Sequence, residues 1–265
     1  MKSRILVAAV GVPLLLLLVL WAPAAVLAVV VAAAAAIAGV ELQQCVGGEK
    51  KGSIVLLSGI FPAAAVLFYF ALPEYITWLL AFEVLFWFCF AIFKGGEVKF
   101  NRIMAALFAG ICIAFSFAAF VRLAQSGISR GYLLLPFILS FMSDTGGYFA
   151  GRAFGKHKLA PKVSPKKTVE GSVGGIVGNI IGGVIFVLVM DKWFGGGIGI
   201  GAMVILAVLC SAVAQIGDLS FSLIKREFGI KDYGKLFLEH GGVLDRFDSV
   251  LFVAPVIEIV LNFLH

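Results

Sequence analysis

The sequence predicts an all-α, polytopic integral membrane protein with about nine transmembrane helices and a cytoplasmic N-terminus. Its 265 residues are 62% hydrophobic and only 14% charged, whereas soluble domains are about half apolar and about a quarter charged. Apolar runs of about 20 residues, enough to cross a hydrocarbon core of about 30 Å, recur along the whole chain. The surplus of apolar side chains is therefore expected to face lipid.

The first apolar run, from Ile5 to Val40, is too long for one crossing. Pro23 interrupts this run, and because proline disfavours a continuous helix, we expect two spans. Residues 1–4 with the apolar stretch after them also have the form of a signal peptide, but an uncleaved first helix is the simpler interpretation for a chain that is membrane-embedded throughout. The later spans are expected near residues 54–72, 75–93, 103–121, 131–150, 171–190, 198–222 and 250–264.

The distribution of positive charge supports this number of spans, because Lys and Arg in short loops gather on the cytoplasmic side. With the N-terminus inside, all but three of the 21 Lys and Arg residues fall on that side, the exceptions being Arg122, Arg130 and Lys192. The net charge of +6 is thus interpreted as a topology signal, and no nucleic-acid partner is expected.

This topology divides the chain into two parts. Residues 1–130 are expected to form a membrane scaffold of about five helices, and residues 131–265 a second membrane region with cytoplasmic loops at 151–170 and 223–248. Glycines between residues 171 and 183 give overlapping G-x-x-x-G pairs, which indicate close helix packing more strongly than a phosphate loop. The four cysteines show no paired C-x-x-C spacing, so neither structural zinc nor disulfides are expected.

Acidic residues inside membrane spans are costly, so each one requires an explanation. Asp144 and Asp218 are expected near the cytoplasmic ends of two spans, and Asp245 and Asp248 just before the last span. Asp245 and Asp248 are three residues apart, so in a helix they would project from one face. Four carboxylates from three segments would therefore meet at one membrane depth, and such hard oxygen ligands suit Mg²⁺ and its substrate phosphates.

Basic residues beside these acids could hold a polyphosphate. Lys166 and Lys167 precede a predicted span in the sequence S-P-K-K-T. Lys225 and Arg226 follow Asp218 by about two helical turns. Lys50, Lys51, Lys94 and Lys99, which have no intramembrane acid beside them, are instead interpreted as topology signals or lipid head-group anchors.

Other polar residues give weaker signals. His240 heads a His-Gly-Gly turn, where contacting a phosphate and ordering the loop are equally open roles. Glu83 and Glu258 are expected to pair with polar groups of neighbouring helices, and neither has an assigned function. The sequence contains no H-E-x-x-H or Walker motif, and no nucleophile for covalent catalysis is assigned.

Two blocks of the second half carry a resemblance to a known family. Residues 222–248 read S-L-I-K-R, four residues, K-D-Y-G and then H-G-G-V-L-D-R-F-D, and residues 143–171 contain S-D-T-G-G-Y, G-R-A-F-G-K-H-K-L and S-P-K-K-T-V-E-G. From about residue 131 onward, the chain resembles the phosphatidate cytidylyltransferases, also called CDP-diacylglycerol synthases. That family usually has Pro-Gly before the histidine, where this chain has Leu238 and Glu239, which puts the shape of this loop in question.

The resemblance implies that residues 131–265 form a catalytic region. It also implies that a cytidylyl group passes from CTP to phosphatidic acid, giving CDP-diacylglycerol and pyrophosphate. It implies Mg²⁺ as cofactor, with a second metal ion left open. The metal ligands it implies are Asp218 and Asp245, with Asp144 and Asp248 beside them. The catalytic residues it implies are Asp144, Lys167, Asp218, Lys225, Arg226, Asp245 and Asp248. The substrate contacts it implies are Ser164, Lys166, Lys167, Thr168, Ser222, Lys225, Arg226, His240 and Arg246.

The reaction also indicates a location. CTP is water-soluble and the diacyl tails stay in the bilayer, so the site is expected at the cytoplasmic face of the cell inner membrane or plasma membrane. Two alternative functions stay open at this point: an ion-coupled transporter, and the same transfer to another phospholipid acceptor. Association into a homodimer is also open, and the sequence does not identify an interface. A transporter would place its site near the midplane of repeated halves, whereas this chain gathers its polar groups at one face.

Overall fold

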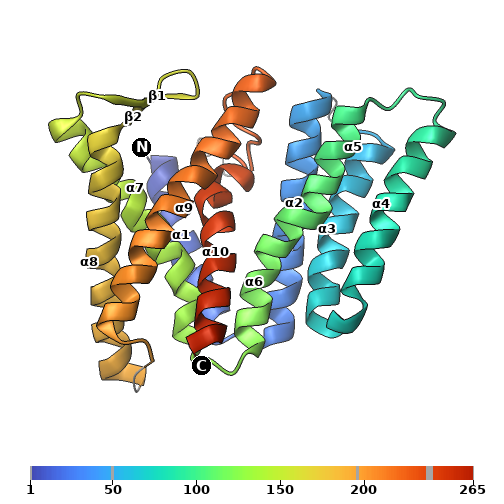
Figure 1. The fold of residues 1–265 in the computed structure, drawn as a ribbon. Helices are drawn as coiled ribbons and strands as arrows, with labels where there is room; N and C mark the ends of the chain where they lie inside the picture. The colour runs from blue at the N-terminus through green and yellow to red at the C-terminus, as the bar shows by residue number, and fades with distance from the viewer. Residues whose placement is uncertain (1, 49–50, 195–196, 237–240, 265) are drawn as a thin grey trace. The chain divides into compact units, whose positions relative to one another are not determined.

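The computed structural model describes residues 2–48, 51–194, 197–236 and 241–264, and this part of the chain is almost entirely helical (Figure 1). Eight helical segments among these residues are long and apolar enough to cross a membrane. The first predicted span corresponds to a helix, α1 (Lys2–Leu20), in which Gly11–Leu20 is a shorter apolar stretch. The prediction of a polytopic helical membrane protein is confirmed.

Contacts divide the chain into two compact units. The first unit comprises Met1–Gln125 with Glu227–Arg246, and the second comprises Ser126–Arg226 with Phe247–His265. The predicted roles of residues 1–130 as scaffold and 131–265 as catalytic region remain predictions.

The first unit begins with α1. Pro23 is the residue immediately before α2, a position that suits proline because it is disfavoured inside a helix but tolerated at its start. The break predicted there is confirmed. After α2, the span predicted at 103–121 forms three consecutive helical pieces, with a π-helical turn, η2, in the middle. The elements of this unit are α2 (Ala24–Gly47), α3 (Ser53–Ala71), η1 (Pro73–Tyr75), α4 (Ile76–Phe93), α5 (Phe100–Leu107), η2 (Phe108–Ile113) and α6 (Ala114–Gln125).

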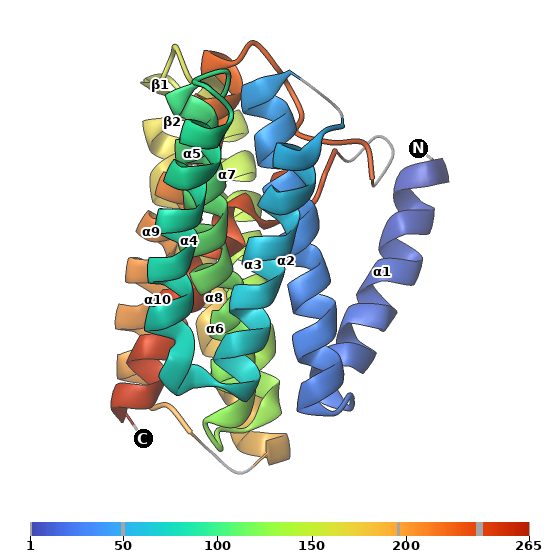
Figure 2. The same ribbon diagram turned by 90° about the vertical axis from the view of Figure 1, so that its right-hand side faces the viewer.

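The interior of the first unit forms around α2 and α3, which run side by side in both views (Figures 1 and 2). A Cβ atom at Gly59 of α3 would lie 3.0 Å from the Ala36 carbonyl oxygen of α2, so these helices approach through small residues. Trp87 and Phe61 are buried beside them. Glu83, also buried, accepts a 3.3 Å hydrogen bond from Trp87 of its own helix and not from a neighbouring helix, which corrects the expectation for this residue.

The second unit carries a short β-hairpin between two of its helices (Figure 1). Its elements are η3 (Arg130–Leu134), α7 (Leu135–Phe154), β1 (Lys158–Ala160), β2 (Ser164–Thr168), α8 (Val169–Phe194) and α9 (Ile200–Glu227), together with α10 (Leu244–Leu264) from Phe247 onward. The predicted loop at 151–170 therefore contains a hairpin, which was not predicted from the sequence. The predicted loop at 223–248 is shorter than expected, because α9 continues to Glu227 and α10 begins at Leu244.

Glycines allow α7 and α8 to pack closely. A Cβ atom at Gly178 would lie 2.6 Å from the Met142 carbonyl oxygen, and one at Gly171 would lie 2.8 Å from the carbonyl oxygen of Gly147. Real Cβ atoms do not come so close, so larger residues would push the two helices apart. The predicted packing role of these glycines is confirmed, and the hairpin between the helices is thereby held over one end of the pair.

Candidate active site

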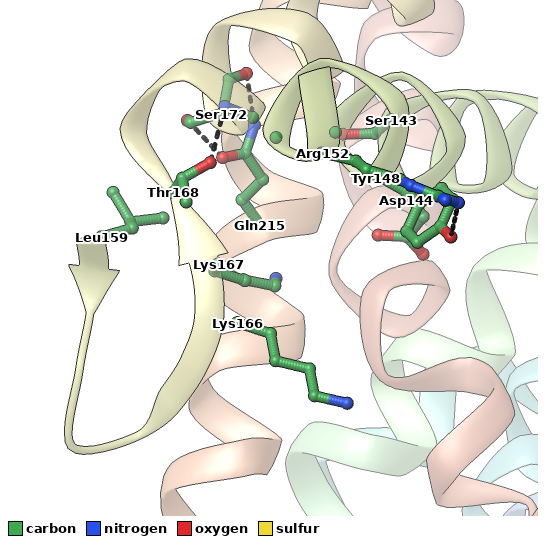
Figure 3. Close-up of a pocket in the computed structure, with 13 residues that line it drawn as sticks. Ser143, Asp144, Tyr148, Arg152, Leu159, Lys166, Lys167, Thr168, Ser172 and Gln215 are labelled. Atoms are coloured by element: carbon green, nitrogen blue, oxygen red, sulfur yellow. Dashed lines mark hydrogen bonds between the residues drawn. The ribbon is translucent and has the colours of Figure 1, made fainter. Parts of the chain in front are cut away.

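The hairpin presents two lysines to the helices of the second unit. Strands β1 and β2 pair antiparallel, with Lys158 opposite Thr168 and Ala160 opposite Ser164. Lys166 and Lys167 lie on β2 and extend from it toward the helices in Figure 3. Thr168 ends the strand and caps α8, because its Oγ1 accepts a 3.1 Å hydrogen bond from the Gly171 amide. The start of α8 thus fixes the position of the adjacent lysines.

Two further contacts hold the hairpin. The Glu170 carboxylate accepts hydrogen bonds of 3.0 and 3.2 Å from the backbone amides of Lys156 and His157, and it also pairs with the His157 ring at 2.6 Å. At the hairpin turn, the Arg226 side chain donates a 3.4 Å hydrogen bond from Nε to the Val163 carbonyl oxygen. The segment that carries the lysines is therefore fastened to α8 at its base and to α9 at its turn.

A cavity of about 320 Å³ lies beside this hairpin, within the second unit (Figure 3). Its walls come from α7, the hairpin, α8 and α9. Glycines form part of the wall, so backbone atoms are accessible to a bound group. The residues that line it are Ser143, Asp144, Gly147, Tyr148, Gly151, Arg152, Leu159, Lys166, Lys167, Thr168, Gly171, Ser172 and Gln215.

An ion pair joins the hairpin to α9 at the cavity. Lys167 Nζ contacts Asp218 Oδ2, and each side chain keeps 24% of its surface exposed. Ser222, one turn further along α9, donates a 3.3 Å hydrogen bond from its hydroxyl to Asp218 Oδ1. Asp218 thus has one oxygen on a lysine and the other on a serine, which fixes its orientation.

Two more carboxylates lie near Asp218. Asp144, on α7, is within electrostatic range of both Asp218 and Lys167. Asp248, on α10, is within electrostatic range of Asp218, Asp144 and the buried Lys225. Three acidic residues from three helices are therefore balanced by two lysines, a charge arrangement that suits a ligand with its own phosphates and cations.

Buried and half-buried polar side chains connect the helices beside these charges. Ser143 of α7 and Ser211 of α9 share a 3.0 Å hydrogen bond between their hydroxyls. Gln215 donates from Nε2 to the Ser211 hydroxyl at 3.2 Å and to the Ser172 carbonyl oxygen at 3.3 Å. The Ser172 hydroxyl in turn donates to Gln215 Oε1. This serine–glutamine network links α7, α8 and α9 at the level where Asp144 and Asp218 enter the site.

The donor atoms fit Mg²⁺ by their chemistry. Mg²⁺ prefers oxygen ligands, and it commonly uses one or two carboxylates and completes its shell with waters and substrate phosphates. The carboxylates of Asp144, Asp218 and Asp248 provide such oxygens. Across the described residues, no three His, Cys, Asp or Glu side chains are close enough to form a metal cluster by themselves. The arrangement therefore fits an ion that arrives with a phosphate ligand better than an enclosed structural metal.

Most of the site residues predicted from the sequence lie together in the second unit. Ser164 begins β2, outside the set of cavity-lining residues. Arg226 is exposed and contacts the hairpin turn. Asp245 and Arg246 belong to the first unit, and the Asp245 carboxylate accepts hydrogen bonds from the amides of Tyr233 and Gly242. The predicted residue His240 lies outside the described residues.

Several residues with a defined place in the structure were missed from the sequence. Gln215 and Arg152 line the cavity, Glu170 fastens the hairpin, and Glu41 contacts the segment before α10. Gln215 could have been found, because it is a polar residue within an apolar run one turn before Asp218. Glu41 could have been counted among the acids of apolar runs, but nothing local to it indicates a partner two hundred residues away.

Fold and site together define a multi-pass helical membrane protein with an acidic and lysine-rich cavity beside a short hairpin. The chain belongs to the cytidylyltransferase family, whose model matches residues 2–264. The family resemblance seen in the sequence is confirmed.

Individual relatives are named phosphatidate cytidylyltransferase. The chain is 46% identical to the one from Haemophilus influenzae over 123 residues, which are 46% of this chain and 43% of the relative. It is 34% identical to the one from Staphylococcus saprophyticus over 160 residues, 60% of each chain. A Staphylococcus aureus relative is 32% identical over 159 residues, 60% of this chain and 57% of the relative. These matches therefore span less than two thirds of the relatives' own length.

Proposed function

We propose that this protein transfers a cytidylyl group from CTP to phosphatidic acid, giving CDP-diacylglycerol and pyrophosphate. The observation that carries this proposal is the Lys167–Asp218 pair at a cavity that also contains Asp144 and Lys166. Family membership and the names of the relatives agree with this reaction. The cavity volume of about 320 Å³ falls in the range of small-ligand sites.

The proposed reaction needs no protein nucleophile. An ionised phosphate oxygen of phosphatidic acid forms a new bond to the α-phosphorus of CTP, while the bond from that phosphorus to the bridging oxygen of the β-phosphate breaks. The electron pair of the broken bond leaves with pyrophosphate. Such transfers depend mainly on positioning and on stabilising the negative charge of the phosphate oxygens.

The residues of the cavity have separate roles in this proposal. Lys166 and Lys167 bind the triphosphate, and Lys167 exchanges its contact with Asp218 for a phosphate oxygen. Asp218, with Asp144 or Asp248, would hold Mg²⁺, which supplies positive charge to the phosphate oxygens. Lys225 balances the acidic residues from the buried side of α9. Metal roles for Asp245, and substrate contacts for Ser164, Ser222, Arg226 and Arg246, stay predictions.

The two substrates come from different phases. CTP reaches the cavity from water past the exposed hairpin turn. The lipid phosphate arrives along α7, where Tyr148 and Phe149 are exposed and Arg152 donates a 3.2 Å hydrogen bond to the Tyr148 hydroxyl. The proposed site faces the cytoplasm of a bacterial cell membrane, as the positive-inside charge pattern predicts. The homodimer expected from the sequence stays a prediction.

A purified-protein assay tests this function. The full chain in detergent is given CTP, Mg²⁺ and phosphatidic acid, and pyrophosphate release is measured with and without the lipid. We expect release that requires all three components. Absence of release, together with ion-dependent flux after reconstitution into liposomes, would replace the proposal with the transporter, whereas release only with a different phospholipid would change the acceptor.

A further inference from the structure

Glu41, near the end of α2, is a buried acidic residue that the proposed chemistry does not use. Only 5% of its surface is exposed. Its two carboxylate oxygens accept hydrogen bonds from the backbone amides of Val243 at 3.0 Å and Leu244 at 2.9 Å. These amides stand where α10 begins, and all three residues belong to the first unit.

This contact satisfies groups that a helix cannot satisfy by itself. The first amides of a helix have no intrahelical acceptor, and they form the positive end of its dipole. A carboxylate that accepts two of them makes charge-assisted hydrogen bonds, which are stronger than neutral ones. Glu41 therefore acts as a cap for α10 that is supplied by a distant helix instead of by a local Ser, Thr, Asp or Asn.

Two glycines of the 222–248 block fit closely around the same carboxylate. A Cβ atom at Gly234, in K-D-Y-G, or at Gly242, in H-G-G, would overlap the carboxylate oxygens of Glu41. The space that their side chains would occupy is thus filled by Glu41. These two positions therefore need glycine because a side chain there would collide with Glu41 of α2.

Asp245 completes the arrangement from the other side. Its Oδ2 accepts hydrogen bonds from the amide of Tyr233 at 2.7 Å and from that of Gly242 at 3.0 Å. Gly241, with φ of +80°, provides the turn between these contacts. The amides of Tyr233, Gly242, Val243 and Leu244 are thus bound by two carboxylates, Glu41 on α2 and Asp245 in the first turn of α10.

We propose that Glu41 is a positioning residue for the proposed cytidylyl transfer, acting through residues 242–244 at the start of α10. The expected effect of Glu41 on turnover rests on the proposed function. Asp245 lies in the first turn of α10 and Asp248 one turn later. A helix start that is no longer fixed moves both carboxylates, so turnover falls even where the protein remains folded.

The test compares two buried glutamates of the first unit. Glu41→Gln retains one oxygen acceptor but adds an amide donor that faces the Val243 and Leu244 amides, and Glu41→Ala removes the contact. Glu83→Gln and Glu83→Ala are the matched controls, because Glu83 is equally buried and its carboxylate contacts Trp87 within its own helix. Each variant of the full chain is measured for amide hydrogen exchange, for turnover per folded protein, and for thermal unfolding.

In Glu41→Ala we expect faster amide exchange in peptides covering 241–246. We also expect turnover to fall by about tenfold or more, since the free energy of one charge-assisted hydrogen bond corresponds to about a tenfold change in rate. Glu41→Gln should lie between Glu41→Ala and the parent chain, and its Mg²⁺ dependence should shift to higher concentrations. The Glu83 controls should leave exchange of 241–246 and turnover unchanged. If Glu41→Ala does not fold, Glu41→Gln decides by the same two measurements.

Unchanged amide exchange of 241–246 in both Glu41 variants would show that Glu41 does not hold the start of α10. Normal turnover per folded protein in both variants would show that Glu41 does not position the site. An inactive parent chain is a separate result. It would reject the proposed function, and with it the kinetic part of this inference, while the exchange measurement would still decide whether Glu41 holds the start of α10.

Discussion

Lys167 and Asp218 form an ion pair that stays partly open to ligands, since each side chain is 24% exposed. In a pair that is this far shielded from water, the cost of desolvating both charges offsets much of their attraction, so the pair is weak evidence for a stabilising role. A stabilising role therefore does not explain why two costly charges are placed at the cavity. Binding and release of a charged ligand explains it, because Lys167 can exchange one anionic partner for another.

Replacing Lys167 tests this exchange. We expect Lys167→Ala to raise the KM for CTP by about tenfold or more, because a charge-assisted contact to the triphosphate is lost. Because the variant also leaves Asp218 without its lysine, some loss of thermal stability is expected, and the KM is therefore measured on folded protein. Lys99→Ala is the control, since Lys99 is an exposed lysine outside the cavity, and its KM should stay within a few-fold. Equal KM values for both variants would contradict the assigned role.

At this scale the sequence predicts which residues are unusual but not which of them touch. Asp218 and Lys167 both stand out, because charges beside apolar spans are costly. Their contact depends on the hairpin, which brings β2 to α9, and no local pattern specifies this approach. The role of Asp245 was also incompletely predicted: its carboxylate was expected to face a metal, and in the structure it accepts two backbone amides.

Among the elements, α7, α8 and α9 meet through the serine–glutamine network and through glycine contacts. Gln215 carries three of the hydrogen bonds in that network. Interhelical hydrogen bonds within membranes average about 0.6 kcal/mol each, so this network contributes modestly to stability. Its placement one turn from Asp218 indicates that its larger effect is on the geometry of the site.

A pair of variants separates these two effects. Gln215→Leu should lower turnover by about tenfold or more, because Asp218 and Asp144 lose their fixed spacing. Asn179→Leu is the matched control: Asn179 also joins α8 to α9, by a 3.2 Å hydrogen bond to the Ala207 carbonyl oxygen, but it is not among the residues that line the cavity. It should lower the thermal unfolding temperature while turnover per folded protein stays unchanged. The same loss of turnover in both variants would mean that the network acts only through general stability.

Helices were predicted well at this scale, because apolar runs of membrane length are unambiguous. Helix ends were predicted less well. Leu244 to Asp248 was expected to be loop but is helical, since Glu41 supplies the cap that the local sequence lacks. The hairpin at 158–168 also escaped prediction, because its strands are short and polar and are held by Glu170 and Arg226 from outside.

For the whole molecule, the membrane topology follows from the positions of lysine and arginine. The hairpin turn, with exposed Lys162, is expected on the cytoplasmic side, and the α3–α4 connection, with exposed Glu74, on the opposite side. Two positions lie on opposite sides of a membrane when the chain crosses it an odd number of times between them, and the predicted spans between Glu74 and Lys162 are 75–93, 103–121 and 131–150. The topology is thus a property of all spans together and not of any single helix.

Cysteine labelling measures this topology. In a chain whose native cysteines are replaced, Lys162→Cys should react with an impermeant thiol reagent from the cytoplasmic side of membrane vesicles only. Glu74→Cys should react from the other side only. Labelling of both positions from the same side would show that the predicted odd number of crossings between them is wrong.

The most direct test follows the α-phosphate of CTP into lipid. CTP labelled at that phosphate is incubated with phosphatidic acid, Mg²⁺ and either the purified parent chain or Asp218→Asn, and the label in the organic phase is compared with pyrophosphate released. We expect one labelled lipid per pyrophosphate from the parent chain. Asp218→Asn should lose about a hundredfold or more of this activity while remaining folded, because the charge that would bind the metal is removed. Near-normal transfer by folded Asp218→Asn would contradict the assignment of this cavity as the site of cytidylyl transfer.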